Sequence, residues 1–139
     1  MSQFLRVYTD GGARGNPGPG ASAFVILKNG KVISKGTRFF SKITNNVAEY
    51  QGVVMALSWL SNNKQEVEGG VVAVYTDSQL VARQLGGLYK IKSAHLKPLA
   101  ETVAELTKKL SVSVKYFSVP RGKNRLADAL VNKEIDENI

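Results

Sequence analysis

The stretch Val7-Tyr8-Thr9-Asp10-Gly11-Gly12 decides how this chain is interpreted, because it places a carboxylate at the end of an apolar strand and follows it with a flexible turn. The same ending, VYTD, recurs at residues 74–77, again after an apolar run. Two strands that both end in Thr-Asp can bring two carboxylates to one edge of a sheet. Oxygen ligands gathered in this way are typical of a site for divalent cations.

Hydrophobic periodicity and turn residues predict the remaining elements outward from these two strands. The predicted strands are residues 4–9, 23–27, 32–40, 71–76 and 112–119. The predicted helices are residues 44–61, 79–85, 94–110 and 126–135. The Gly/Pro cluster at residues 11–20 is expected to stop the first strand, Asn29-Gly30 to form a hairpin turn, and residues 64–70 and 120–125 to be loops. This order predicts an α/β fold with a mixed sheet and helices on its faces.

Composition limits the possible classes of protein. A chain of 139 residues fits one domain, which we expect to span residues 1–139. No apolar run approaches the roughly 20 residues of a membrane helix, and the start lacks a signal-peptide pattern, so we expect a soluble, cytoplasmic protein without a membrane partner. The absence of cysteine excludes disulfides, thiolate metal sites and a cysteine nucleophile. The net charge of +8 favours an anionic partner, with nucleic acid first.

Four acidic residues lie where a site would need them. Asp10 and Asp77 end strands, Glu49 lies in the first turns of the first long helix, and Asp128 lies at the start of the last helix. Each one alone could be a helix cap or a turn residue. Together they would repel one another unless divalent cations neutralised them, and all-oxygen ligands select Mg²⁺ or Mn²⁺. With the basic charge, this predicts phosphodiester chemistry assisted by two metal ions.

Four sequence blocks extend the argument to nearly the whole chain, about residues 4–132. They are DGGARGNPGPG at 10–20, TNNVAEY at 44–50, YTDSQ at 75–79 and NRLADAL at 124–130. In order and spacing they resemble the signature blocks of type 1 ribonuclease H. The resemblance implies a ribonuclease H-like fold, with a five-stranded mixed sheet of three antiparallel strands plus parallel strands, flanked by helices on both faces.

The resemblance also implies a reaction: endonucleolytic cleavage of the RNA strand of an RNA/DNA hybrid, leaving 3′-hydroxyl and 5′-phosphate ends. Asp10, Glu49, Asp77 and Asp128 match the catalytic and metal-binding carboxylates of the family. Asp10 would bridge two Mg²⁺ ions, for which Mn²⁺ can substitute. Asp128 would hold the ion that activates water, and Glu49 and Asp77 the ion on the leaving-group side.

Other motif residues match positions that bind the hybrid in this family. Gly11 and Gly12 would let the backbone approach the RNA strand, where 2′-hydroxyls distinguish RNA from DNA. Asn16, Asn45 and Gln79 match positions that touch base edges in the minor groove. The remaining substrate-binding candidates are Thr44, which matches a position near a DNA phosphate, and the cations Arg14 and Lys90. Turn and cap chemistry is the alternative explanation, because Thr44 and Asn45 would serve the start of a helix in any case.

The chain departs from some members of the family. Several have a histidine in the loop before the last aspartate, whereas the single histidine here, His95, is expected to open a helix elsewhere. Arg121 is the best candidate to replace it, as a permanent cation that binds phosphate without shuttling a proton. The segment 86–93 is short compared with the long basic insertion of some members, and no N-terminal hybrid-binding domain is expected. We therefore expect weaker, salt-sensitive hybrid binding.

Three alternatives remain open at this point. A nuclease of broader scope could also cut double-stranded RNA, and no residue decides this. A catalytically silent hybrid-binding module would have lost one of the four acids, and all four are present. A metabolic enzyme that binds Mg²⁺ and a phosphorylated metabolite would not explain the full set of motifs. We expect the protein to be a monomer.

Overall fold

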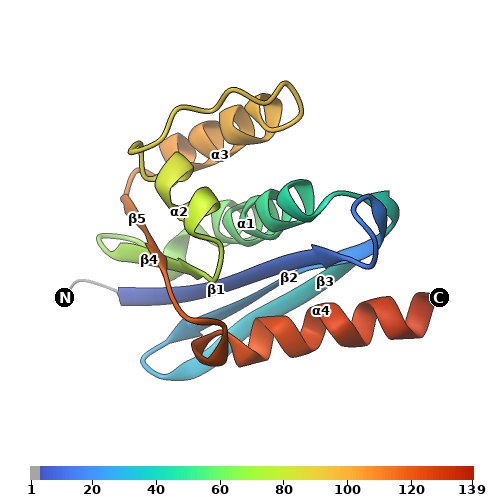
Figure 1. Cartoon of the computed structure of the whole chain (residues 1–139). Coiled ribbons are helices and arrows are strands. Elements are labelled where there is room, and N and C mark those ends of the chain that lie inside the picture. Colours follow the sequence, from blue (N-terminus) through green and yellow to red (C-terminus); the bar gives the residue numbers. More distant parts are fainter. Residues whose placement is uncertain (1–3) are drawn as a thin grey trace.

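Five strands form one mixed sheet in the order β3-β2-β1-β4-β5 (Figure 1). The strands are β1 (Phe4–Ala13), β2 (Gly18–Lys28), β3 (Lys31–Ile43), β4 (Val71–Thr76) and β5 (Ser113–Ser118). The first three pair antiparallel, whereas β4 pairs parallel with both β1 and β5. The computed structural model describes residues 4–139, so the expected path of residues 1–3 into the first strand lies outside the described residues.

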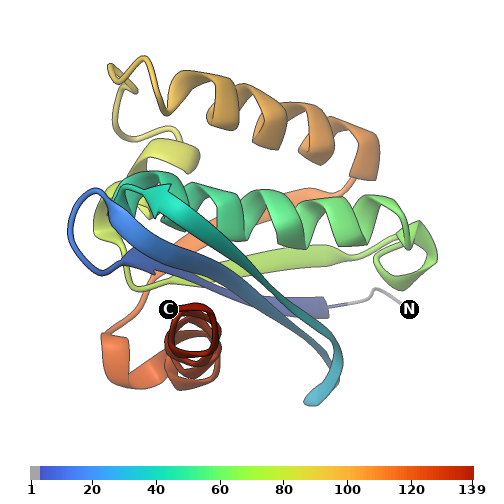
Figure 2. The ribbon, with the colours of Figure 1, turned by 90° about the vertical axis from the view of Figure 1, so that its right-hand side faces the viewer.

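Helices cover both faces of the sheet, as the sequence predicts. They are α1 (Asn45–Ser61), α2 (Gln79–Leu85), α3 (Lys97–Leu110) and α4 (Arg125–Asn138). Figures 1 and 2 show α1, α2 and α3 on one face, with α3 outermost, and α4 alone on the other. Two single turns of 3-10 helix lie in the predicted loops, η1 (Lys64–Glu66) and η2 (Arg121–Lys123). The predicted order of strands and helices is confirmed.

The first strand is longer than the sequence suggested. The sequence predicts a strand over residues 4–9 that the Gly/Pro cluster stops, but β1 continues to Ala13, and Gly11, Gly12 and Ala13 pair with residues 22, 21 and 20 of β2. The ladder bonds use backbone groups alone, so glycine weakens a strand without ending it. Asp10 therefore lies inside a strand, paired with Ala23 of β2, rather than at its end.

One large apolar core lies between the sheet and α1. Its fully buried side chains come mainly from β1, β2, β4 and α1, and include Leu5, Ile26, Val74, Val53 and Leu57. A separate, smaller cluster lies under α4. It consists of Ala21, Ala23, Val131 and Ile135, with Leu130 packed against it. The two faces of the sheet are thus stabilised by cores of very different size.

Two helix starts can be compared with their predictions. The Thr44 hydroxyl caps α1 by accepting a hydrogen bond from the Val47 N–H at 3.3 Å, as expected. The helix α3 begins at Lys97 rather than at residue 94, with Pro98 in its first turn, where a missing N–H costs nothing. His95 therefore precedes α3 instead of opening it.

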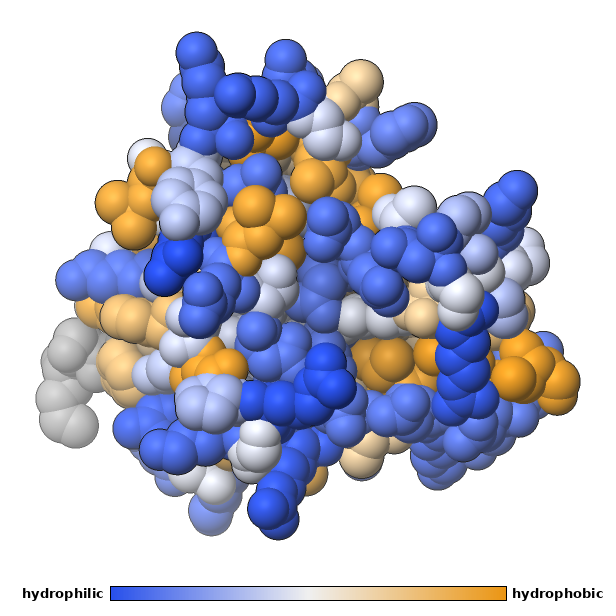
Figure 3. All heavy atoms as spheres, viewed as in Figure 1, coloured by the Kyte–Doolittle hydropathy of each residue, from blue (hydrophilic) through white to orange (hydrophobic). Residues whose placement is uncertain are grey.

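The face of the molecule seen in Figure 3 is mostly polar. Figure 3 shows hydrophobic patches that are small and separated by hydrophilic side chains. None of the helices within residues 4–139 combines the length and the apolar character that crossing a membrane would require.

Candidate active site

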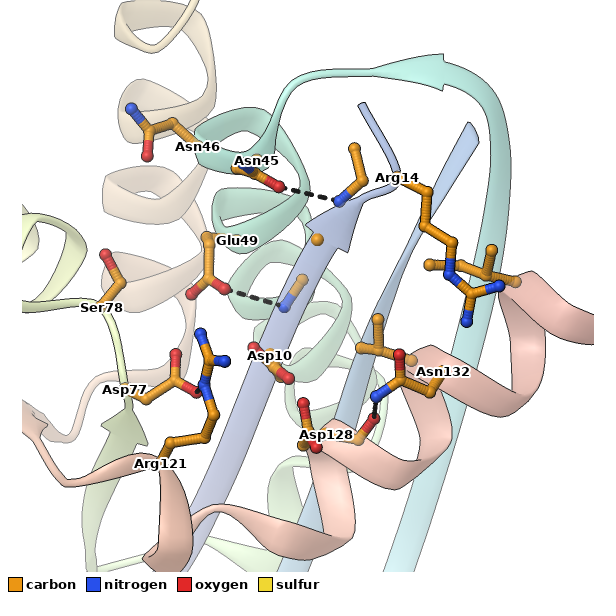
Figure 4. Close-up of a pocket in the computed structure, with 15 residues that line it drawn as sticks. Asp10, Arg14, Asn45, Asn46, Glu49, Asp77, Ser78, Arg121, Asp128 and Asn132 are labelled. Atoms are coloured by element: carbon orange, nitrogen blue, oxygen red, sulfur yellow. Dashed lines mark hydrogen bonds and ion pairs between the residues drawn. The ribbon is translucent and has the colours of Figure 1, made fainter. Parts of the chain in front are cut away.

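Three of the predicted carboxylates meet at the carboxyl-end edge of β1 and β4. Asp10 comes from β1, Glu49 from α1 and Asp77 from the residue after β4, and each offers an oxygen within 4.8 Å of the other two. Asp10 is 5% exposed and Glu49 8% exposed. Asp128 on α4 lines the same pocket, of about 530 Å³, outside this tight group. Figure 4 shows all four side chains pointing toward a common space.

Glu49 joins the two central strands. Its Oε1 accepts a hydrogen bond from the Gly11 N–H at 3.1 Å, and its Oε2 accepts one from the Thr76 hydroxyl at 3.1 Å. The Thr76 hydroxyl in turn accepts the Ser78 N–H at 3.1 Å. The carboxylate is thus held to β1 and to the end of β4, which orients it before any ligand binds.

Gly11 lets α1 approach β1 closely enough for this contact. A Cβ at Gly11 would lie 2.2 Å from the carbonyl carbon and oxygen of Ala48, so no other residue fits without moving the helix. A Cβ at Gly12 would meet only the side chain of Asn45, at 3.9 Å. The structure therefore explains Gly11 by helix–strand packing, whereas Gly12 faces the pocket with room beside it.

Asn124 is a site residue that sequence reasoning did not single out. It is 1% exposed, and its side-chain amide donates to the Thr9 carbonyl at 2.9 Å. A hydrogen bond with Asn124 also lowers the pKa of Asp77, although less than burial raises it. Asn124 thereby ties the start of α4 to β1. The sequence signal that could have identified Asn124 is its position four residues before Asp128. Its partners, Thr9 and Asp77, are distant in sequence.

Burial and mutual repulsion dominate the electrostatics of the site. Burial raises the pKa of Asp10 to about 6, and burial followed by the charge of Asp10 raises the pKa of Glu49 further above its usual range. Burial also raises the pKa of Asp77, which Arg121 partly offsets from 3.8 Å away. Carboxylates kept this close are costly to ionise, and a divalent cation removes that cost.

The donor set fits a hard divalent cation. Three carboxylates supply oxygen ligands at one point, and the chain has no cysteine to favour a softer metal. The pocket above them is open and polar, so an ion would keep positions free for water or phosphate oxygens. The site thus matches the predicted divalent metal centre.

Several predicted substrate-binding residues line one rim of the site. Asn45 accepts a hydrogen bond from the Ala13 N–H at 2.9 Å and donates its backbone N–H to the Asn16 side chain at 3.0 Å. Asn16 and Thr44 border a neighbouring hollow that also includes His95. These hydrogen bonds orient the side chains of Asn45 and Asn16 at the surface between β1 and α1.

The other predicted residues are more dispersed. Gln79 borders a second hollow, which it shares with Arg121. Arg14 lines the main pocket and forms an ion pair with Asp136 of α4. Lys90 is exposed in the segment between α2 and α3 and does not line the pocket. The pocket-lining polar residues that sequence reasoning did not select are Asn46, Ser78 and Asn132.

Comparisons with known proteins agree with this geometry. The RNase H family matches residues 2–136. Bifunctional protein Rv2228c of Mycobacterium tuberculosis is 33% identical over 132 residues, which are 94% of this chain and 35% of that protein. Ribonuclease HI of Halobacterium salinarum is 32% identical over 137 residues, with 96% of this chain and 65% of the relative covered. The chain thus spans between about a third and two thirds of these curated relatives.

Solved structures show the same fold. LC11-RNase H1, determined in complex with an RNA/DNA hybrid, is 36% identical and superimposes with a TM-score of 0.90, covering 96% of this chain and 97% of that one. RNase H1 from the halophilic archaeon Halobacterium salinarum gives a TM-score of 0.85 at 32% identity, with 96% and 98% coverage. With the family match over nearly all of its length and the carboxylate site at the expected sheet edge, this chain belongs to the RNase H family.

Proposed function

We propose that this chain is a metal-dependent endoribonuclease that hydrolyses the RNA strand of an RNA/DNA hybrid, leaving 3′-hydroxyl and 5′-phosphate ends. The observation that carries the proposal is the meeting of Asp10, Glu49 and Asp77 within 4.8 Å at the floor of an open polar pocket. Membership of the RNase H family and the hybrid bound to LC11-RNase H1 support the choice of substrate.

The four carboxylates would hold two Mg²⁺ ions, with Mn²⁺ as a substitute. Asp10 lies between the other acids and would be shared by both ions, with Glu49 and Asp77 on one side and Asp128 on the other. Ions bound there would supply water activation and neutralise charge on the leaving oxygen. The hydrogen bonds from Gly11 and Thr76 hold Glu49 in place for this task.

The rim beside α1 would receive the hybrid. Gly12, Asn45 and Asn16 present small or amide groups at the pocket edge, and amides of this kind can bond 2′-hydroxyls and the minor-groove edges of bases. Gln79 would contribute from the opposite side. Minor-groove contacts distinguish bases poorly, so little sequence preference should follow.

A cleavage panel tests the proposal. RNA/DNA hybrid, double-stranded RNA, single-stranded RNA and duplex DNA are each incubated with the protein in Mg²⁺, Mn²⁺ or EDTA. We expect cleavage of the RNA strand of the hybrid in either metal and none in EDTA. If no metal supports hybrid cleavage, the proposal is wrong, and cleavage of double-stranded RNA would broaden the substrate class.

The adjacent glycines provide a matched pair of variants. Gly11→Ala is expected to lower the free energy of unfolding by roughly 1 to 3 kcal/mol, because its methyl group would overlap the Ala48 backbone. Gly12→Ala should keep the stability of the parent and instead raise KM for the hybrid, because its methyl group would occupy the proposed path of the RNA backbone. Thermal melts and steady-state kinetics separate the two effects, and equal melting temperatures for both variants would contradict this packing argument.

Arg121 is placed to act on phosphate near the metal site. Its Nε lies 3.8 Å from Asp77 Oδ2, and its side chain is 82% exposed. Arg121→Ala should lower kcat more than it raises KM, because an exposed cation at the pocket edge would assist the departure of the charged product. Removing the cation also lets the pKa of Asp77 rise, so the acid limb of the kcat/KM profile should move to higher pH.

Arg121→Lys is the control, since it keeps the charge while removing the planar guanidinium group. It should retain the acid limb of the parent and recover part of kcat. An unchanged kcat and an unchanged pH profile in Arg121→Ala would rule out this role.

A further inference from the structure

The face of the sheet that carries α4 is only partly covered. In Figure 1, α4 begins below the middle of β1 and extends away from the end where β1 starts, and no helix of the described chain lies beneath that end. The strand register places three rows of residues on this open part. The rows across β1, β4 and β5 are Phe4, Val71 and Ser113; Arg6, Ala73 and Lys115; and Tyr8, Tyr75 and Phe117.

The third row forms a column of stacked rings. The ring centroids of Tyr8 and Tyr75 are 5.1 Å apart at 21°, and those of Tyr75 and Phe117 are 5.5 Å apart at 26°. Rings lying flat side by side could not approach this closely, so the three rings stand upright on the sheet and overlap face to face. Because β5 is the edge strand, Phe117 ends the column, and it is 44% exposed. A further flat ring could extend the column there.

The surroundings of the column are cationic. Arg6 and Lys115 occupy the next row and are both exposed, and Arg6 also lies over the Phe4 ring at 5.7 Å. Two hollows of about 250 and 260 Å³ meet at Tyr8 and Leu27 beside the column. Their lining, as far as the structure describes it, includes Lys123 and Arg125 and contains no acidic side chain.

From these observations we propose that the open sheet face is a second nucleic-acid site, which binds a single strand with one base stacked on Phe117 and phosphates beside Lys115 and Arg6. Aromatic rings with adjacent cations bind single strands in this way, because every base has a π face and every nucleotide a negative charge. A stacked base would gain both the ring contact and the field of these cations. An apolar protein partner would leave the cations without counter-charges.

The site adjoins the carboxylate pocket. Tyr8 and Tyr75 each precede a predicted metal ligand by two residues, which is about 7 Å along a strand. A single-stranded extension leaving the pocket could therefore reach the column. Binding at this face does not depend on the proposed hydrolase activity, and it can be measured without cleavage.

Fluorescence anisotropy with a short labelled oligothymidylate, in EDTA and over a range of salt concentrations, tests the proposal. DNA lacks the 2′-hydroxyl, and without metal the carboxylate pocket repels phosphates, so both conditions disfavour binding in the pocket, and the variants below locate the binding that remains. Phe117→Leu keeps an apolar side chain without a ring and should weaken binding roughly 5-fold or more. Lys115→Ala should weaken binding and reduce the salt slope by about one.

Lys109→Ala on α3 is the matched control, because it removes one exposed lysine on the opposite side of the sheet. Its affinity should equal that of the parent. Phe117→Trp, with a larger ring, should bind at least as tightly as the parent, which keeps the test valid if Phe117→Leu folds poorly. If Lys109→Ala and Lys115→Ala lose the same amount of affinity for the oligothymidylate, the binding is nonspecific attraction to a basic protein, and the proposal is overturned.

The main competing occupant is a second copy of the chain. Sedimentation velocity should show monomers over the concentration range of the binding assay. A dimer that dissociates in Phe117→Leu would assign this face to self-association and overturn the nucleic-acid site.

Discussion

Asp10→Asn is expected to lower metal-dependent cleavage of an RNA/DNA hybrid by roughly a thousandfold or more. Asparagine keeps the size of the side chain and one oxygen ligand but removes the charge that lies within 4.8 Å of the Glu49 and Asp77 carboxylates. The effect should appear in kcat at saturating Mg²⁺, because the proposed hybrid-binding rim is unchanged. Single-turnover kinetics with an end-labelled RNA strand measure it directly.

The folded state of Asp10→Asn should be intact, which separates loss of chemistry from loss of structure. Circular dichroism and the melting temperature check this point. Glu105→Gln, which removes an exposed carboxylate of α3, is the control and should cleave at the rate of the parent. Near-normal turnover of Asp10→Asn would remove the basis for the proposed metal centre.

The second large effect concerns stability without metal. The raised pKa values of Asp10 and Glu49 mean that the folded protein binds protons more tightly than the unfolded chain does. The stability that these groups contribute is therefore fully present below their unfolded pKa values, near 4, and is lost as pH rises through the folded values. In EDTA, the melting temperature should fall from about pH 4 to about pH 6 as Asp10 ionises, and should continue to fall toward about pH 9 as Glu49 ionises.

Asp10→Asn should reverse much of this loss. With the pKa of Asp10 at about 6, its share is on the order of 3 kcal/mol, or roughly 5 to 10 °C in melting temperature. The variant should thus melt above the parent at pH 8 in EDTA, and the pH dependence should be flatter. Adding Mn²⁺ should raise the melting temperature of the parent more than that of the variant. A parent protein that gains stability with pH in EDTA would contradict the electrostatic argument.

The same site shows what the sequence could predict. Strand-ending Asp10 and Asp77 were predictable, because parallel strands bring their carboxyl ends to one edge. Glu49 followed from its motif, and the structure brings these three together. The large core under α1 also followed from its apolar periodicity. These features depend on local patterns and on the pleat of the strands.

Other features depend on contacts distant in sequence and were missed. The turn propensity of glycine and proline predicts that the first strand ends at residues 11–20. Pairing with β2 instead carries β1 through Gly11 to Ala13. Glycine is required at position 11 because the backbone of Ala48 leaves no room for a Cβ, and local sequence cannot reveal this contact. The bond from Asn124 to the Thr9 carbonyl joins residues 115 positions apart. Such pairings are set by tertiary packing, which outweighs local propensity.

The small cluster under α4 has a consequence for cooperativity. Segments with few buried apolar contacts open at lower free energy than the main core, through sub-global unfolding. Opening of α4 would carry away Asp128 and the adjoining η2 turn with Arg121, while the Leu57 core and three carboxylates stayed in place. The protein would then be active only while α4 is closed, and the opening and closing of α4 would be an equilibrium separate from global folding. A spectroscopic folded fraction would overstate the active fraction as the temperature approaches the melting transition.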